Sequence, residues 1–202
     1  MRKLTLFLAI LFVSVLCSAC INNIAIQELN NKAQEFMQKG DFQSAISRLE
    51  SSVDLDGTVF ETRYNLGVAY ISAQEFKKAQ EQLNEAIKIK PDFADSYYSL
   101  AVAQESDALK ILEDDEDDET NVEVEVVSDD NDEFSNLKNI SEEEAKQLVD
   151  MLSKAVNSYK KYLELKPDTN DKSDVEAQIS YLEETAAKYA QKYQIGDFGA
   201  AE

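Results

Sequence analysis

The chain has 202 residues, of which 40 are Asp or Glu and 20 are Lys or Arg, and it contains two Cys, no His and no Trp. With a pI near 4.3, the protein is negatively charged at neutral pH and repels phosphates, so we expect no nucleic acid partner. Without His, the Ser-His-Asp, Cys-His and His-based zinc sites are excluded. Five Gly and two Pro are too few for a loop-rich all-β fold. Composition therefore favours a helical binding protein over an enzyme, with no catalytic residue, metal site or cofactor.

The first twenty residues follow the order of an export signal. A positively charged start is followed by a 13-residue apolar run over 4–16, and two small residues then precede Cys20. The run is short for a membrane span and has the length of a secretory apolar segment. This segment resembles the signal peptide of a bacterial lipoprotein, in which the Cys is diacylated and becomes the first residue of the mature chain. Cys17 stands where that family usually has Leu.

The resemblance implies that residues 1–19 are removed, that Cys20 carries the lipid and that residues 20–25 form a short tether. The protein would then be secreted and anchored to a bacterial membrane, with the periplasmic face of the outer membrane favoured. Cys20 would be the only Cys left, so it could not form an internal disulfide. The alternatives are an ordinary signal peptide with a stray Cys or an uncleaved N-terminal anchor.

A period of 34 residues organises the chain after this segment. Several residues recur at that spacing with the same character: Phe36 with Tyr70, Phe42 with Phe76, Ala45 with Ala79, and Leu49 with Leu83. Small residues at such positions allow paired helices to approach closely, and large ones fill the layer between pairs. A single helical pair cannot bury its apolar face alone, so the units are expected to stack.

The second repeat, 60–93, reads Leu66-Gly67-x-x-Tyr70 and continues with Ala79, Leu83, Ala86 and Pro91. This pattern resembles the tetratricopeptide repeat. The resemblance implies an all-α fold, an α-solenoid of about three helical hairpins closed by a C-terminal capping helix. The implied segments are repeats at 26–59, 60–93 and 94–167, a capping helix at 168–193 and a flexible tail at 194–202.

An acidic insertion interrupts the third repeat. Sixteen Asp or Glu residues and one Lys lie between Glu113 and Glu144, so we expect a disordered segment over about 113–140. Both helices that flank it should exceed the usual repeat length. Capping-box patterns at Ser141 with Glu144 and at Ser173 with Glu176 predict two helix starts.

The resemblance also implies a partner-binding groove. In tetratricopeptide proteins the fifth, ninth and twelfth positions of each first helix commonly face a concave surface. These positions are Asn30, Gln34 and Met37 in repeat one, Tyr64, Val68 and Ile71 in repeat two, and Tyr98, Val102 and Glu105 in repeat three. None is Lys or Arg, so a clamp for a peptide's C-terminal carboxylate is not expected.

The sequence thus predicts a lipid-anchored protein–protein interaction scaffold of the bacterial envelope, which binds a peptide or protein segment in the groove. One alternative is that the acidic insertion binds a basic partner or a divalent cation. A built calcium loop is not expected there, because Phe134 and Ile140 stand where an EF-hand starting at Asp129 needs Gly and Glu. Catalysis is not expected either, because the clustered acids lie in a segment too mobile to hold catalytic geometry, and the other acids scatter over solvated helix faces.

Overall fold

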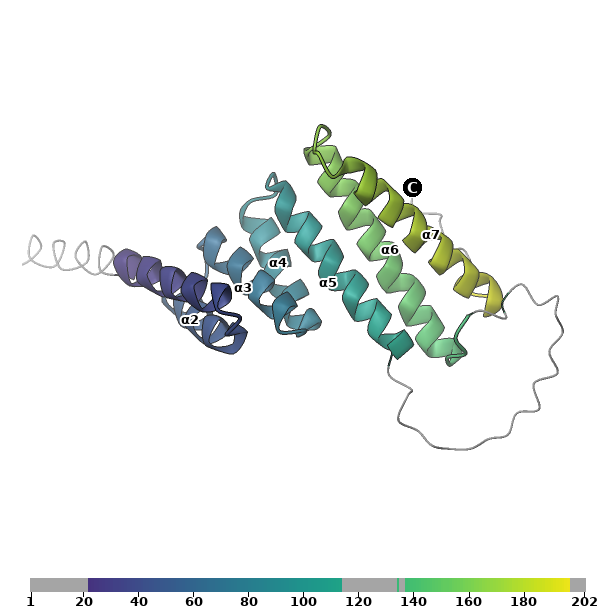
Figure 1. Ribbon diagram of the computed structural model, residues 1–202, viewed down its shortest axis with the longest axis horizontal. Coiled ribbons are helices and arrows are strands. Elements are labelled where there is room, and N and C mark those ends of the chain that lie inside the picture. The colour runs from purple at the N-terminus through teal and green to yellow at the C-terminus, as the bar shows by residue number, and fades with distance from the viewer. Residues whose placement is uncertain (1–21, 114–133, 135–136, 197–202) are drawn as a thin grey trace, which may run out of the picture. The chain divides into compact units, whose positions relative to one another are not determined.

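A computed structural model of the chain describes residues 22–113, 134 and 137–196 (Figure 1). These residues form helices and no strand, which confirms the expected all-α class. Two compact units divide the chain, one up to Pro91 and the other from Asp92 onward. The predicted signal, the lipid site Cys20 and most of the acidic insertion lie outside the described residues.

The first unit consists of an N-terminal helix over 22–38, α2 (Phe42–Leu55), α3 (Phe60–Ser72) and α4 (Phe76–Ile89). Asp41 is the N-cap of α2, and its carboxylate accepts a hydrogen bond of 3.1 Å from the Ser44 amide. Helix α3 packs against both α2 and α4. Helices α2, α3 and α4 fall within the expected repeats at 26–59 and 60–93. The N-terminal helix begins at residue 22, so residues 22–25, expected to be part of a short tether, belong to this helix.

The close approach of α3 and α4 depends on a glycine. A Cβ atom added at Gly67 would lie only 2.5 Å from Cγ of Leu83, which is completely buried. Ala79, one turn earlier on α4, is also completely buried, and its carbonyl oxygen lies 3.4 Å from the same point. Small side chains therefore allow the two helices to pack tightly, as the repeat pattern predicts.

The turns inside the first two repeats share one backbone motif. Gly40 and Gln74 both have positive φ, 73° and 60° respectively. Each is followed by an amide that donates back to a carbonyl five residues earlier, from Asp41 to Phe36 and from Glu75 to Tyr70. This is the Schellman ending of a helix, in which glycine is the favoured residue at the left-handed position. Gln74 adopts that conformation at an energetic cost that Gly40 avoids.

Replacing Gln74 by Gly is expected to stabilise the protein by about 0.5–1 kcal/mol, because the relief of left-handed strain exceeds the added entropy of the unfolded chain. The matched change Gly40→Ala should destabilise it by about 1 kcal/mol, although no atom lies within 4 Å of the new methyl group. Urea unfolding of the two variants measures both effects. An unchanged or lower stability for Gln74→Gly would contradict the expectation.

The second unit contains three longer helices. Helix α5 (Ala94–Glu113) has 20 residues, α6 (Glu142–Leu165) has 24 and α7 (Lys172–Lys192) has 21, against 13 or 14 for α2, α3 and α4. The expected extension of both helices beside the insertion is therefore confirmed. Helix α6 lies between α5 and α7 and packs against both (Figure 1).

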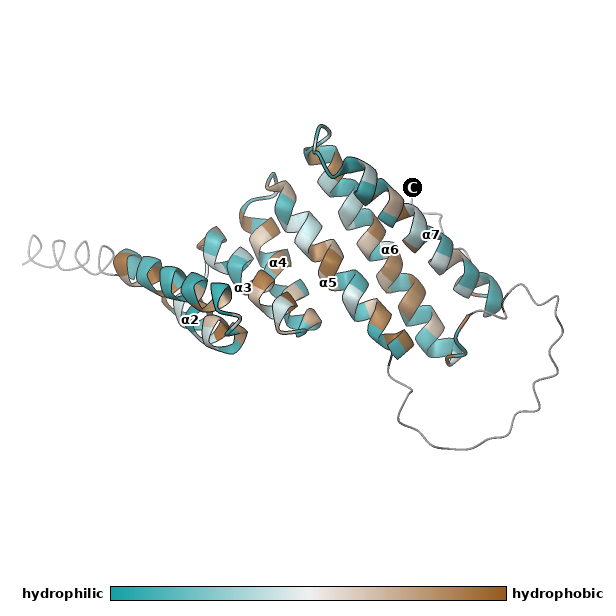
Figure 2. Ribbon diagram, viewed as in Figure 1, coloured by the Kyte–Doolittle hydropathy of each residue, from teal (hydrophilic) through white to brown (hydrophobic). Residues whose placement is uncertain are grey.

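Apolar residues alternate with polar ones along these helices (Figure 2), and the apolar ones form the core of the unit. Leu148 and Leu152 of α6 and Leu182 of α7 are completely buried. Helix α5 contributes small residues, Ala101 and Ala108, to the same core. The segment predicted as a capping helix thus supplies much of the buried surface of this unit.

The two predicted helix starts have different outcomes. Ser141 and Glu144 form the expected capping box, in which each side chain bonds the other's backbone amide. The prediction at Ser173 was wrong, because α7 begins at Lys172 and its N-cap is Asp171, two residues before Ser173. The Asp171 carboxylate accepts hydrogen bonds from the hydroxyls of Tyr162 and Thr169, so tertiary contacts fix the start of α7.

Both ends of the segment predicted to be disordered differ from that expectation. Glu113 is the last residue of α5, and residues 137–140 are held against the unit. The Lys138 ammonium donates to the Leu112 carbonyl at 2.7 Å, near the carboxyl end of α5. Leu137 and Ile140 pack on the core, which provides the physical reason for their order. The stretch between, 114–133 with 135–136, lies outside the described residues.

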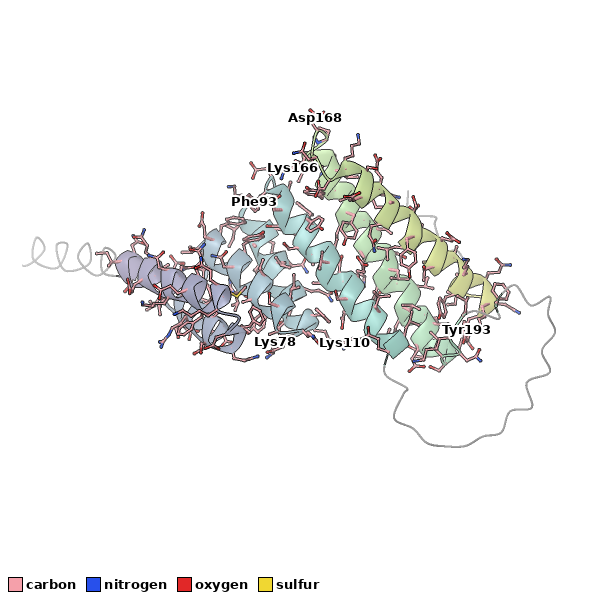
Figure 3. The ribbon with its side chains drawn as sticks, in the orientation of Figure 1. Lys78, Phe93, Lys110, Lys166, Asp168 and Tyr193 are labelled. Atoms are coloured by element: carbon pink, nitrogen blue, oxygen red, sulfur yellow. The ribbon has the colours of Figure 1, made fainter. Side chains whose placement is uncertain are left out.

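The end of α7 secures the same segment. Tyr193, which lies at that end (Figure 3), accepts a hydrogen bond of 2.9 Å from the Ile140 amide through its hydroxyl oxygen. The Lys192 ammonium donates to the Leu137 carbonyl at 3.1 Å and to Asn139 Oδ1 at 2.8 Å. Ile195, expected in a flexible tail, packs on the core, and its amide donates to the Ala190 carbonyl in a third Schellman-type bond that ends α7. The exit of the insertion and the end of α7 are thus joined.

Candidate functional site

Each unit contains a cavity lined by residues predicted to face the groove. The cavity of the first unit has a volume of about 180 Å³ and lies among the N-terminal helix, α2 and α3. Its walls combine apolar side chains with three amides, and the lining residues are Asn30, Ala33, Gln34, Met37, Leu49, Asn65 and Val68. Four of the nine predicted groove residues therefore lie together here.

Asn30 also has a structural role that the repeat pattern did not predict. Its amide nitrogen donates to the Ile26 carbonyl at 2.9 Å, to Ser52 Oγ at 3.0 Å and to Thr62 Oγ1 at 2.9 Å. Ser52 and Thr62 are completely buried, and they also lie 3.2 Å from each other. Asn30 thus links the N-terminal helix to α2 and α3, so it supports the fold as well as the cavity wall.

Asn30→Ala is expected to destabilise the protein by about 1–3 kcal/mol, because it leaves buried hydroxyls without their amide partner. Gln34→Ala, one turn further along the same helix and exposed, should change stability by less than about 0.5 kcal/mol. Chemical denaturation of both variants tests this difference. Equal stabilities for the two would mean that the Asn30 contacts contribute little.

The second unit contains a larger cavity of about 420 Å³, bounded by α5, α6 and α7. Three predicted groove residues line it, together with two further carboxylates and a buried tyrosine. The complete lining is Tyr98, Val102, Glu105, Ser106, Tyr159, Asp171, Asp174, Val175 and Gln178. All nine residues belong to the unit that starts at Asp92.

Glu105 is held by two neutral donors in this cavity. The Tyr159 hydroxyl donates to Glu105 Oε2 at 2.8 Å, and the Gln178 side-chain amide donates to Oε1. Burial and the neighbouring Glu105 carboxylate raise the pKa of Tyr159 well above its ordinary value. Tyr159 therefore stays protonated and acts as a donor, which orients the Glu105 carboxylate as an acceptor.

Aromatic rings form one wall of the same cavity. Tyr98 is 38% exposed and packs edge-on against Tyr159 and Tyr162, with ring centroids 5.7 and 5.2 Å away. Asp171 also lines this cavity. Its carboxylate accepts a hydrogen bond from the Thr169 hydroxyl, which lowers the pKa of Asp171. The carboxylate is therefore charged at neutral pH.

A short turn joins α6 to α7 beside this wall. Lys166 and Asp168 lie in the turn (Figure 3). The Lys166 ammonium pairs with Asp95 at 3.1 Å and lies 5.7 Å from the centre of the Tyr162 ring. The positive charge at this end of the unit is thus already paired with a carboxylate of α5.

The remaining predicted groove residues, Tyr64 and Ile71, line neither cavity. Tyr64 stacks on Phe60 of its own helix, with ring centroids 6.0 Å apart. Sequence reasoning also missed several lining residues, which come from positions outside the three columns that it used. The polar ones among them are Asn65, Ser106, Tyr159, Asp171, Asp174 and Gln178, and the apolar ones are Ala33, Leu49 and Val175. A periodic pattern along first helices carries no signal for side chains contributed by α6 and α7.

Residues 36–105 match the family model of the tetratricopeptide repeat. This match agrees with the Leu66-Gly67-x-x-Tyr70 pattern and with the paired helices of the first unit. No curated protein matches the sequence closely enough to be a relative.

Several solved structures share the fold at low sequence identity. The first tetratricopeptide domain of Spaghetti (RPAP3), bound to the HSP90 peptide SRMEEVD, is 15% identical with a TM-score of 0.55, and the match covers 80% of this chain and 93% of that one. The second such domain of human RPAP3, in complex with the HSP70 peptide SGPTIEEVD, is 12% identical with a TM-score of 0.53, covering 80% and 97%. The Arabidopsis OM64 domain is 13% identical with a TM-score of 0.54, covering 80% and 96%.

Two kinds of feature are absent from the described residues. No group of three or more Cys, Asp or Glu side chains among them is arranged to hold a metal ion. No helix in the described part of the chain is long and apolar enough to cross a membrane.

Proposed function

We propose that the protein is a lipid-anchored interaction scaffold of the bacterial envelope, which binds a peptide or protein segment on the first-helix side of its repeats. The observation that carries the proposal is that seven of the nine predicted groove residues line two cavities, one in each unit. These cavities combine apolar walls with amides, hydroxyls and carboxylates, which suits an extended segment with both kinds of side chain. The peptide complexes of the two RPAP3 domains support this choice of partner class.

Capture from detergent-solubilised bacterial envelopes tests the binding role. The full chain should retain a specific protein partner, and the double variant Met37→Ala with Tyr98→Ala should retain much less of it. Tyr181→Ala is the matched control, because Tyr181 is 54% exposed on α7 and lines neither cavity. Circular dichroism establishes that all variants are folded. Equal capture by the double variant and the wild type would refute binding through these cavities.

The acidic insertion is the other candidate for the binding surface. Replacing 114–133 by a short Gly-Ser linker removes twelve Asp or Glu residues. Capture that depends on this segment and not on Met37 and Tyr98 would assign the binding to a basic partner of the insertion. Unchanged capture by the shortened chain would leave the cavities as the binding surface.

The anchoring part of the proposal rests on the sequence before residue 21. Metabolic labelling with a fatty acid should label the protein in a bacterial host and should fail on Cys20→Ser. Cys17→Ser is the matched control, since Cys17 lies in the segment expected to be removed. Labelling that survives Cys20→Ser would show that the lipid site is elsewhere, and no labelling of the wild type would refute the anchor. Fractionation of the labelled protein then assigns the membrane.

A further inference from the structure

The cavity bounded by α5, α6 and α7 is strongly one-sided in charge. Three of its lining residues carry carboxylates, namely Glu105, Asp171 and Asp174, and none is Lys or Arg. We propose that this cavity binds a positively charged side chain of the partner segment, Arg in preference to Lys. The inference rests on the proposed function and specifies the chemistry of the partner.

Glu105 supplies the central interaction. Its two oxygens each accept one hydrogen bond from a neutral donor, Tyr159 on one side and Gln178 on the other. These donors position the carboxylate but leave its charge without a cation inside the cavity, and each oxygen keeps a further lone pair. A guanidinium group matches that acceptor, because its planar set of N–H donors can bond both oxygens of a carboxylate at once.

The aromatic wall adds a second attraction for the same group. Tyr98 is partly exposed and lies beside Tyr159, so the ring wall is accessible from the cavity. A guanidinium or ammonium group within about 6 Å of an aromatic face is attracted to its π electrons. The side chain of Val102 offers an apolar surface for the methylene stem of the incoming residue.

Asp174 and Asp171 extend the negative field toward α7. Asp174 is exposed in the first turn of that helix, where its charge also favours the helix dipole. Asp171 is already oriented by Tyr162 and Thr169. The negative charges of these two carboxylates therefore steer a cation toward Glu105, which forms the direct hydrogen bonds with it.

Two other ligands fit this cavity less well. A carboxylate such as those in SRMEEVD or SGPTIEEVD would be repelled by the three acidic side chains, so the preference is opposite to the acidic peptides of the RPAP3 domains. A divalent metal ion needs several oxygen ligands around one point, and no such group is found among the described residues.

Peptide selection tests the inference on the full chain. A random heptapeptide library is selected against the wild type, and the enriched peptides are then measured on wild type, Glu105→Gln and Glu176→Gln. Glu105→Gln keeps the shape and an acceptor for Tyr159, so it removes the charge with little change in packing. Glu176→Gln is the matched control, because Glu176 lies on α7 outside the cavity. The acidic insertion is identical in all three proteins, so its attraction for basic peptides cancels.

We expect enriched peptides that contain Arg or Lys, whose affinity falls about tenfold or more on Glu105→Gln and stays unchanged on Glu176→Gln. Replacing the basic residue by uncharged citrulline should cause a similar loss on the wild type and little on Glu105→Gln. Enriched peptides without a basic residue, or basic peptides insensitive to Glu105→Gln, would overturn the inference and leave the proposed function standing. No enrichment at all would overturn both.

Discussion

Leu83→Ala is expected to destabilise the protein by about 2–4 kcal/mol, among the largest effects of a single change, because the side chain is completely buried between α3 and α4. Gly67→Ala should cost about 1–3 kcal/mol by the opposite mechanism, since its new methyl group would overlap Cγ of Leu83. Urea unfolding of each single variant measures both values.

The double variant distinguishes this packing from two independent effects. Removing the Leu83 side chain creates the space that the Gly67→Ala methyl group needs, so the pair should lose less stability than the sum of the single changes. The expected coupling is about 1 kcal/mol or more. Gly196→Ala is the control, because no atom lies within 4 Å of its added methyl group. Additive losses would mean that the contact between α3 and α4 does not limit their approach.

Deleting the whole predicted insertion, 113–140, is expected to destabilise the protein by about 3 kcal/mol or more. This deletion removes the partly buried side chains of Leu137 and Ile140 and the hydrogen bonds that Lys138 and the Ile140 amide make. Deleting only 114–133, with a short Gly-Ser linker, should leave stability within about 1 kcal/mol of the wild type, because loop length itself has a small effect.

Thermal unfolding of the two deletions in parallel tests the role of the retained segment. The same experiment separates stability from binding, since only the shorter deletion is suitable for the capture assay. A shorter deletion as unstable as the longer one would contradict the account, because the described contacts at 137–140 would then not be what holds this end of the unit. A longer deletion with wild-type stability would contradict it equally.

Much of the fold could be predicted because the repeat constrains several levels at once. The 34-residue spacing that relates Ala45 to Ala79 and Leu49 to Leu83 places equivalent residues in equivalent buried positions. Gly40 and Gln74, which are also 34 residues apart, end the first helix of each repeat at equivalent positions. Since spacing, side-chain size and turn chemistry agree, the pattern indicated both the helices and their pairing.

The local patterns failed where a tertiary contact decided the outcome. Ser173 and Glu176 match a capping box, but Asp171, which bonds Tyr162 and Thr169, precedes the helix instead, so the helix starts two residues earlier than that pattern predicts. The disorder predicted from charge was wrong for residues 137–140, because the apolar side chains there pack on the core. The net charge of a whole segment does not reveal that two partly buried apolar residues at its edge pack on the core.

The candidate site was predictable only on its first-helix side. Seven of the predicted residues line a cavity, but Asn30 also bonds Ser52 and Thr62 inside the first unit. Ser52 stands where the second repeat has Ala86, and that departure could have suggested a buried polar partner. The cavity-lining residues of α6 and α7 could not be predicted, because the pattern of one repeat does not show which side chains of later helices line the same cavity.

Site-specific photo-crosslinking in living bacteria tests whether a partner protein binds on the cavity side of each unit. A photoreactive phenylalanine analogue is placed at Gln34 or Tyr98, on the cavity side of each unit, and at Glu81 or Lys154 as exposed controls on second helices. We expect crosslinks to a common partner protein from Gln34 and Tyr98, and none from Glu81 or Lys154. Crosslinks from the second helices alone, or none from either cavity, would contradict it.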